Sequence, residues 1–259
     1  MRLLFLGTGT SQGVPMIGCE CAVCRSADPR DQRRRSALLI QSGATRILID
    51  SGPDLRAQAL TFGVSRLDAV VYTHGHNDHA IGFDDLRRYC EMTGRPLPVH
   101  ASRATLEMLR RVFPYAFDPT LKVSTYVSAE PHEEVAGREF IIGDVGLTPI
   151  NVPHGRTPTF GYLLAEHGAR KAAYLPDCAA LTEPMAAALR DIPVLIIDGL
   201  REEPHPTHLN ISGAIEAARR VGAGLTYLTH LTHNVAHAER QRSLPAGVVL
   251  AHDGLELAL

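Results

Sequence analysis

The sequence lacks several features that would place it in a particular class of protein. It has no long proline-, glycine- or serine-rich linker, so we expect residues 1–259 to form one α/β domain. Its formal net charge is -2 and its basic stretches are short and scattered, so a duplex nucleic-acid partner is not expected. The first apolar run, residues 3–6, is far too short for a signal peptide or a membrane span. We therefore expect a cytoplasmic protein that does not associate with membranes.

Cysteine is also scarce, and its distribution is uneven. Three of the five cysteines, Cys19, Cys21 and Cys24, lie in the stretch "GCECAVC". In a reducing compartment this C-x-C-x2-C spacing favours a closed structural zinc site with one corner still vacant, rather than disulfides. The alternative is a group of small buried apolar residues. Cys90 and Cys178 have no such neighbours and are interpreted as core residues.

The chain is rich in short apolar runs that are typical of strands, with helical periodicity between them. Turn signals separate the runs, and hairpin-like neighbours such as residues 150–177 indicate mixed or antiparallel sheets. The glycines of "LGTGTSQG" give neither GxGxxG nor a P-loop, so a layered sandwich with outer helices is favoured over a nucleotide-binding fold. The expected strands are residues 3–6, 37–41, 46–49, 69–72, 97–100, 147–152, 159–165, 171–175, 194–197, 225–228 and 248–251. The expected helices are residues 54–62, 84–92, 104–112, 183–190 and 210–224, the last capped by Asn210 or Ser212.

One loop carries a dense set of metal-binding side chains. Directly after the apolar run 69–72, the stretch "THGHNDHAIG" supplies His74, His76, Asp78 and His79 in an HxHxDH pattern. Imidazole and carboxylate groups suit zinc, manganese or iron, and a tight loop after a strand can aim them at neighbouring points. A polar surface loop with chance histidines is the alternative, and the pattern argues against it.

These four side chains cannot easily reach a single tetrahedral ion, because the adjacent Asp78 and His79 must point differently from the two histidines before them. Two ions are the natural solution. The remaining ligands are then expected at other strand ends, where His154, Asp177 and His230 each follow an apolar run.

The order and spacing of these residues resemble those of the metallo-β-lactamase-fold hydrolases over nearly the whole chain. The resemblance implies a four-layer αβ/βα sandwich of two mixed sheets with outer helices. It also implies that Asp50, in "ILIDSG", orients the histidine loop, and it places Asp50 and Asp78 among the catalytic residues. On this resemblance the first ion takes His74, His76 and His154, the second takes Asp78, His79 and His230, and Asp177 bridges the two.

The charge of such a centre favours hydrolysis. Two divalent ions, two carboxylates and one bridging hydroxide leave about one positive charge, which attracts a phosphate or a developing oxyanion. Paired ions about 3.5–4 Å apart also hold hydroxide near neutral pH. We therefore expect a metal-dependent hydrolase with two divalent ions, which could be zinc, manganese or iron.

A narrower resemblance is to the phosphoribosyl cyclic phosphodiesterases of the carbon-phosphorus lyase pathway and their relatives. It lies in "GTGTSQGVPMIGCECAVC", "TFGYLL", "THLN" and the terminal "HDGLEL". It implies that His233 completes the structural zinc site of the three cysteines, and that His208 binds phosphate or protonates the leaving oxygen. The expected substrate is a small cyclic phosphate or nucleotide-like phosphodiester, and family analogy favours a homodimer.

Other functions remain open at this stage. The stretch "IGFDDLRR" is plainer in broader relatives than in the pathway's own enzyme, which leaves the substrate undecided; Arg87 or Arg88 could reach a phosphate, although surface helix charges are the commoner case. A lactone or thioester hydrolase would use the same centre. A non-catalytic metal-binding protein would lack a ligand, and none is missing. A tRNA-processing nuclease is disfavoured because no long basic arm is visible.

Overall fold

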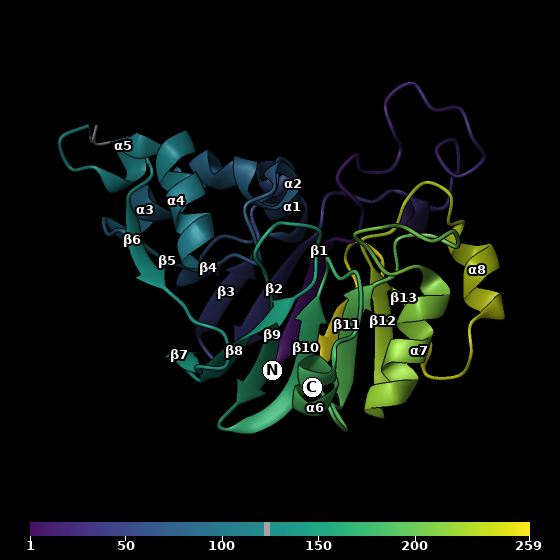
Figure 1. Cartoon of the computed structure of the whole chain (residues 1–259). Coiled ribbons are helices and arrows are strands. Elements are labelled where there is room, and N and C mark those ends of the chain that lie inside the picture. The colour runs from purple at the N-terminus through teal and green to yellow at the C-terminus, as the bar shows by residue number, and fades with distance from the viewer. Residues whose placement is uncertain (122–124) are drawn as a thin grey trace.

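The computed structural model describes residues 1–121 and 125–259. They form two seven-stranded mixed sheets that pack face to face, with helices on the outer faces (Figure 1). The expected four-layer αβ/βα sandwich is confirmed. In this described part of the chain, no helix combines the length and the apolar character needed to cross a bilayer.

Both sheets change from antiparallel to parallel pairing half-way across. The first three pairs of each sheet are antiparallel and the last three are parallel, reading the first sheet from β14 and the second from β7. The first sheet contains, in spatial order, β14 (Glu256–Ala258), β1 (Arg2–Gly7), β2 (Ala37–Ser42), β3 (Thr45–Ile49), β4 (Ala69–Val71), β5 (Leu97–Ala101) and β6 (Ala129–Glu133). The second contains β7 (Phe140–Ile142), β8 (Val145–Val152), β9 (Thr159–Glu166), β10 (Ala169–Leu175), β11 (Val194–Asp198), β12 (Leu225–Thr229) and β13 (Val248–Leu250).

The interior between the sheets explains why the central strands are apolar on both faces. Side chains such as Leu38, Ile49, Tyr162 and Ile196 meet there and are almost fully buried. The opposite faces of the same strands are covered by helices, so neither face of a central strand contacts water. Each fully buried aliphatic side chain of this kind contributes roughly 1.5–3 kcal/mol to folding.

The helices divide between the two outer faces. Those on the first sheet are α1 (Leu55–Phe62), α3 (Arg87–Thr93), α4 (Arg103–Val112) and α5 (Pro114–Phe117). Those on the second sheet are α6 (Glu183–Ala188) and α7 (Ile211–Val221), and α8 (His237–Ser243) lies beside β13. Three short helices occur within loops: η1 (Pro29–Asp31), α2 (Asn77–Ala80) and η2 (Ile81–Leu86).

Helix α7 is the clearest case of a helix whose limits follow from sequence. The Asn210 side chain accepts a hydrogen bond from the Gly213 backbone N–H, which makes Asn210 the N-cap of the two candidates. The helix ends at Val221 and is capped by Gly222, whose φ of 69° glycine adopts without steric strain. Its apolar face, including Ile211 and Ala218, is buried against the second sheet.

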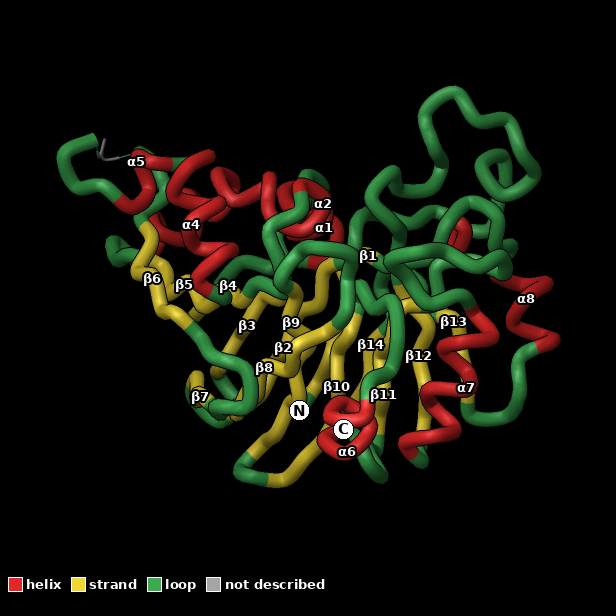
Figure 2. Tube along the Cα trace, in the orientation of Figure 1, coloured by secondary structure: helices red, strands yellow, loops and turns green. Residues whose placement is uncertain are grey.

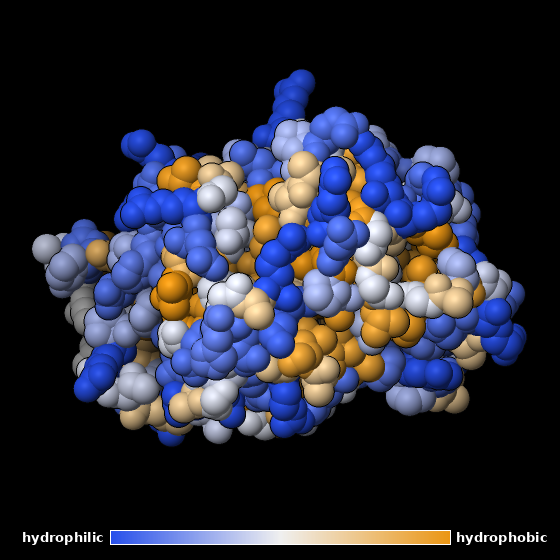
Figure 3. Space-filling view, turned by 90° about the horizontal axis from the view of Figure 1, so that it is seen from below, coloured by the Kyte–Doolittle hydropathy of each residue, from blue (hydrophilic) through white to orange (hydrophobic). Residues whose placement is uncertain are grey.

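The loops that carry the predicted ligands gather at one end of the sandwich. Figure 2 shows long loops above the ends of both sheets, including the segments that follow β4, β8, β10 and β12. Strands β8, β10 and β12 of the second sheet run in the same direction, so their carboxyl ends lie at one edge and the side chains placed just after them converge. From the opposite side, patches of apolar side chains lie within a mostly hydrophilic surface (Figure 3).

Candidate metal centres

The seven predicted active-site ligands converge on the loop end of the sandwich. The structure sorts them into two neighbouring groups, within each of which the potential ligand atoms lie within 4.8 Å of one another. The first group contains His74, His76, His154 and Asp177, and the second contains Asp78, His79 and His230. This is the same division as the one the sequence resemblance implies.

Asp177 lies between the two groups and turns one oxygen toward each. Its Oδ2 is 3.6 Å from His74 Nε2 and 3.5 Å from His154 Nε2. Its Oδ1 is 3.2 Å from His79 Nε2 and 3.3 Å from His230 Nε2. A carboxylate in this position can bind one cation through each oxygen, which is the geometry required of a bridging ligand.

Asp78 is the carboxylate of the second group. Its Oδ2 lies 3.4 Å from His79 Nε2 and 3.6 Å from His230 Nε2. Burial alone would raise the pKa of Asp78 and of Asp177, but the surrounding histidines lower both pKa values below the usual range. Both groups are therefore carboxylates near neutral pH, as metal binding requires.

The histidines fall into two electrostatic classes. Burial lowers the pKa values of His74, His76 and His154, so these rings are neutral and can offer a lone pair. Burial also acts to lower the pKa values of His79 and His230, but nearby carboxylates, Asp177 first among them, raise both. The second group therefore attracts positive charge, which a bound cation would supply.

Buried atoms without hydrogen bonds provide a separate test of whether a cation fits. Among the described residues, His74 Nε2, His79 Nε2, His230 Nε2 and Asp177 Oδ1 are buried and make no hydrogen bond of acceptable geometry. Unsatisfied buried polar atoms are rare in folded proteins and each needs an explanation. Here they face one another, and the histidine and carboxylate donor set suits a divalent metal ion.

Hydrogen bonds on the far side of the rings fix which nitrogen each histidine presents. Asp50, which is fully buried with a positive φ of 65°, accepts hydrogen bonds from the backbone N–H and the hydroxyl of Thr73. Its Oδ2 also lies 2.7 Å from His79 Nδ1, so this ring turns Nε2 toward the site. The Thr73 hydroxyl lies 3.0 Å from His74 Nδ1 and directs that ring in the same way. Asp50 thus occupies the orienting position that the resemblance implies.

His208, to which the sequence resemblance assigns phosphate binding or proton donation, lies beside the second group. Its ring stacks on that of His230 at 4.9 Å with an angle of 11°, and one of its nitrogens lies within 4.8 Å of ligand atoms of Asp177 and His230. Burial, and then the neighbouring His230, lower the pKa of His208 to about 4. The neutral ring donates a hydrogen bond from Nδ1 to Asp198 Oδ2 over 2.6 Å.

Asp198 was not identified in the sequence analysis. It ends β11, is fully buried, and accepts hydrogen bonds from the backbone N–H groups of Cys178 and Leu200 as well as from His208. Its position relative to His208 corresponds to that of Asp50 relative to His79. The available signal was the similarity of "LIIDGL" to "ILIDSG", where an aspartate ends an apolar strand in both.

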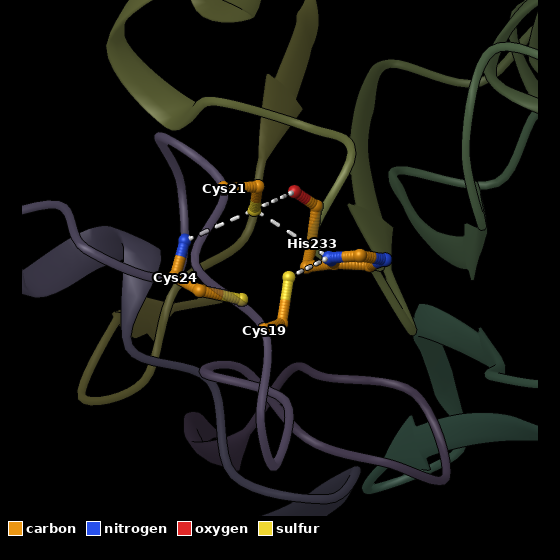
Figure 4. A group of neighbouring side chains, drawn as sticks. All are labelled: Cys19, Cys21, Cys24 and His233. Carbon is orange, nitrogen blue, oxygen red and sulfur yellow. Dashed lines mark hydrogen bonds between the residues drawn. The ribbon is translucent and has the colours of Figure 1, made fainter.

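The three cysteines and His233 form a separate group (Figure 4). Cys19 Sγ and Cys21 Sγ lie 3.2 Å and 3.5 Å from His233 Nδ1, and the ligand atoms of all four residues lie within 4.8 Å of one another. A hydrogen bond from the Cys24 backbone N–H lowers the pKa of Cys21 to about 6, which favours a thiolate, whereas burial raises the pKa of Cys24 to about 11. Three sulfurs and one imidazole suit a closed tetrahedral zinc site.

Contacts other than those of the cysteines also hold the His233 segment. Leu231 exchanges backbone hydrogen bonds with Thr8 and Thr10. The buried Arg33 donates hydrogen bonds to the carbonyl oxygens of Thr232 and Val235, at 3.0 Å and 2.7 Å. These contacts hold the segment that carries His230 and His233 against Thr8, Thr10 and Arg33 even without a metal ion.

Four other residues considered in the sequence lie outside these groups. Cys90 is buried in the core of the first sheet and Cys178 in that of the second. Arg87 forms an ion pair with Asp84, and Arg88 forms one with Glu91. Local pairing accounts for both arginines.

The chain resembles known proteins in both sequence and structure. The family model described as "Beta-lactamase superfamily domain" matches residues 45–231. The crystal structure of a diphosphatase of the PhnP family is 39% identical, covers 100% of this chain and 97% of its own, and superposes with a TM-score of 0.90. Zn²⁺-bound PqqB from Methylobacterium extorquens is 21% identical, with full coverage of both chains and a TM-score of 0.82, and shares the fold. An octanoyltransferase from Porphyromonas gingivalis is 39% identical over 99% of this chain, which spans about half (51%) of that protein's length.

Proposed function

The chain belongs to the β-lactamase superfamily and, within it, to the PhnP family, and from this premise we propose that it is a dimetal phosphodiesterase acting on small phosphate esters. Its fold and family are those of metal-dependent hydrolases. The observation that carries the proposal is the position of Asp177, with one oxygen turned toward each of two complete groups of ligands. The proposed substrate is a cyclic phosphate or a nucleotide-like phosphodiester, hydrolysed by water.

In this proposal the two groups hold one divalent ion each. Bound ions would supply positive charge to phosphoryl oxygens and would activate water near neutral pH. The chain's own contribution is to fix the ligand atoms: Asp177 and Asp78 provide the negative charge, and Asp50 keeps His79 turned toward the site. Zinc, manganese and iron all suit this set of ligands.

His208 is proposed to act on the substrate oxygen. Its Nδ1 is held by Asp198, so its Nε2 is the atom left to hydrogen bond with a phosphate or leaving oxygen. A bound phosphate adds negative charge beside the ring, and this favours a proton on Nε2 that can pass to the leaving oxygen.

The experiment that tests the function is a substrate panel with the metal-loaded protein. Bis(p-nitrophenyl) phosphate and 2',3'- and 1,2-cyclic phosphates are expected to be hydrolysed. A chelator is expected to stop turnover, and added zinc or manganese to restore it. Failure to turn over any phosphate ester with any of these metals contradicts the proposal, and turnover of lactones or thioesters alone would assign the centre to carboxylic esters.

Hydrolysis of a diphosphate is a second candidate. The specific observation in its favour is the 39% identity to a diphosphatase that the chain covers almost completely. The same two groups would serve, because diphosphate and phosphodiester hydrolysis both place negative phosphoryl oxygens beside the ions. Nucleoside diphosphates in the panel, with phosphate release as the readout, distinguish the two candidates.

We predict that removing His208 reduces turnover without removing metal. His208→Ala is expected to lower kcat by about 10²–10⁴-fold, the usual contribution of a positioned proton donor, while the metal content stays at the wild-type level. Asp198→Asn is expected to lower kcat less, and the double variant no further than His208→Ala alone, because Asp198 acts through His208.

The matched control for this prediction is Glu134→Gln. Glu134 also holds a histidine, with its Oε1 2.8 Å from His100 Nδ1, but this pair lies outside the metal groups. Its substitution is expected to leave turnover unchanged. If His208→Ala keeps wild-type kcat, or if the effects of His208 and Asp198 multiply independently, the proposed role of this pair is wrong.

A further inference from the structure

His76 presents a different ring nitrogen from the other histidines of the first group. In His74 and His154 the Nδ1 atom is occupied, by the Thr73 hydroxyl and the Thr207 carbonyl oxygen, so Nε2 faces the site. In His76 the Nδ1 atom faces inward and lies 3.3 Å from His154 Nε2. Its Nε2 points the other way, and the Thr157 hydroxyl lies 2.9 Å from it.

The exposed position of His76 makes this contact important. The other two histidines of the group are buried, and packing limits their orientation, whereas the His76 side chain is exposed at the start of the short helix α2. An exposed imidazole can rotate and exchange its proton between the two nitrogens. Among the described residues, the His76 ring has two hydrogen-bonding neighbours, the ring of His154 and the Thr157 hydroxyl.

The backbone around Thr157 is itself well held. The Thr157 backbone N–H donates to the His154 carbonyl oxygen over 3.1 Å, closing a turn in which Gly155 has a positive φ of 56°. The Thr159 hydroxyl donates to the Thr157 carbonyl oxygen over 3.1 Å. One turn therefore carries both a ligand of the first group and the hydroxyl beside a second ligand.

We propose that Thr157 is a positioning residue that fixes His76 with Nε2 protonated and Nδ1 directed at the metal. With an ion bound in the first group, the Thr157 oxygen accepts a hydrogen bond from His76 Nε2–H, and the lone pair on Nδ1 faces the ion. Hydrogen bonds of this kind, made by the nitrogen that does not bind the ion, typically change metal affinity by 10–100-fold. The inference rests on the metal-binding role proposed for the first group.

The first measurement is the tautomer of His76 with metal bound. In zinc-loaded protein, ¹⁵N–¹H correlation spectra of the imidazoles, assigned by comparison with His76→Gln, are expected to show His76 protonated at Nε2. Thr157→Val preserves the shape of the side chain but removes the hydroxyl, and it is expected to give a mixture of the two tautomers. Thr157→Ser restores the hydroxyl and should recover the wild-type spectrum.

The second measurement is metal affinity, by competition with a chelator. Thr157→Val is expected to bind one of the two active-site ions about 10–100-fold more weakly, and Thr157→Ser to bind it as the wild type does. Thr120→Val is the matched control, because it also removes a threonine hydroxyl that hydrogen bonds to a side chain, that of Asp118, away from the metal groups. Its affinity for both ions should be unchanged.

The two measurements separate this inference from the proposed function. An Nδ1-protonated His76 in the zinc-loaded wild type, or a Thr157→Val variant with unchanged tautomer and affinity, overturns the role of Thr157. A wild-type protein that binds no active-site ion contradicts the proposed function, whereas a wild type that binds both ions and a Thr157→Val variant that binds them equally well contradict only the role of Thr157. Amide spectra of each variant verify the fold, and Thr157→Ala replaces Thr157→Val if the latter does not fold.

Discussion

His76→Ala is expected to lower metal-dependent hydrolysis by at least about 10³-fold while leaving the fold stable. The loss corresponds to about 4 kcal/mol of transition-state stabilisation, which is in the range expected when one ion of a pair is lost. His76 supplies one of three imidazoles in the first group, yet its exposed side chain contributes nothing to the hydrophobic cores. The catalytic and structural effects of its removal should therefore separate.

Three measurements check this prediction: turnover of bis(p-nitrophenyl) phosphate, metal content per chain, and the thermal unfolding midpoint of the metal-free protein. His132→Ala is the matched control, because His132 is also a partly exposed histidine but stacks on His100 away from the metal groups. It should retain full activity. If His76→Ala keeps wild-type turnover, the assignment of ligands to the first group is wrong.

The second large effect separates His230 from His233, although the two lie in one stretch, "LTHLTH". His230→Ala is expected to lose an active-site ion and at least about 10³-fold in turnover. His233→Ala and Cys21→Ser are expected to lose one zinc, to loosen the cysteine loop and to lower turnover less than tenfold. The smaller loss follows because Arg33 and the backbone bonds of Leu231 hold this segment without the zinc.

Metal analysis, turnover and amide hydrogen exchange together test this division. In His233→Ala and Cys21→Ser, exchange should accelerate in residues 16–25 while the strands keep their protection. In His230→Ala the cysteine loop should exchange as in the wild type. Equal loss of active-site metal in all three variants would show that the two histidines serve one site.

The central strands were predictable because they are buried on both faces. A strand between two apolar layers has no polar alternation, so runs such as residues 38–40 and 194–197 are easily recognised. The three strands that were not predicted lie at sheet edges. Strand β6 reads AEPHE and β14 reads ELA, so neither has an apolar run. Strand β7 reads FII, which is apolar but only three residues long.

The candidate site was also only partly predictable from the sequence: residues close together in the chain were found, and residues that act on a distant partner were missed. The HxHxDH loop is visible because its four side chains lie within six residues, and His154, Asp177 and His230 were candidates because each follows an apolar run. The resemblance to a family supplied only their division between two ions. Asp198 and Thr157 were missed because each acts through a histidine 10 and 81 residues away, respectively. The likeness of "LIIDGL" to "ILIDSG" marks Asp198 as an aspartate at a strand end, but the histidine partner of Asp198 or Thr157 is identified only when the fold brings the two together.

The most direct test of the two-ion centre is anomalous X-ray diffraction from crystals of the metal-loaded protein. We predict two peaks flanking the Asp177 carboxylate, one beside His74, His76 and His154 and the other beside Asp78, His79 and His230. A third peak, at the zinc edge, should lie among Cys19, Cys21, Cys24 and His233. One peak or none beside Asp177 at saturating metal would contradict the two-ion centre.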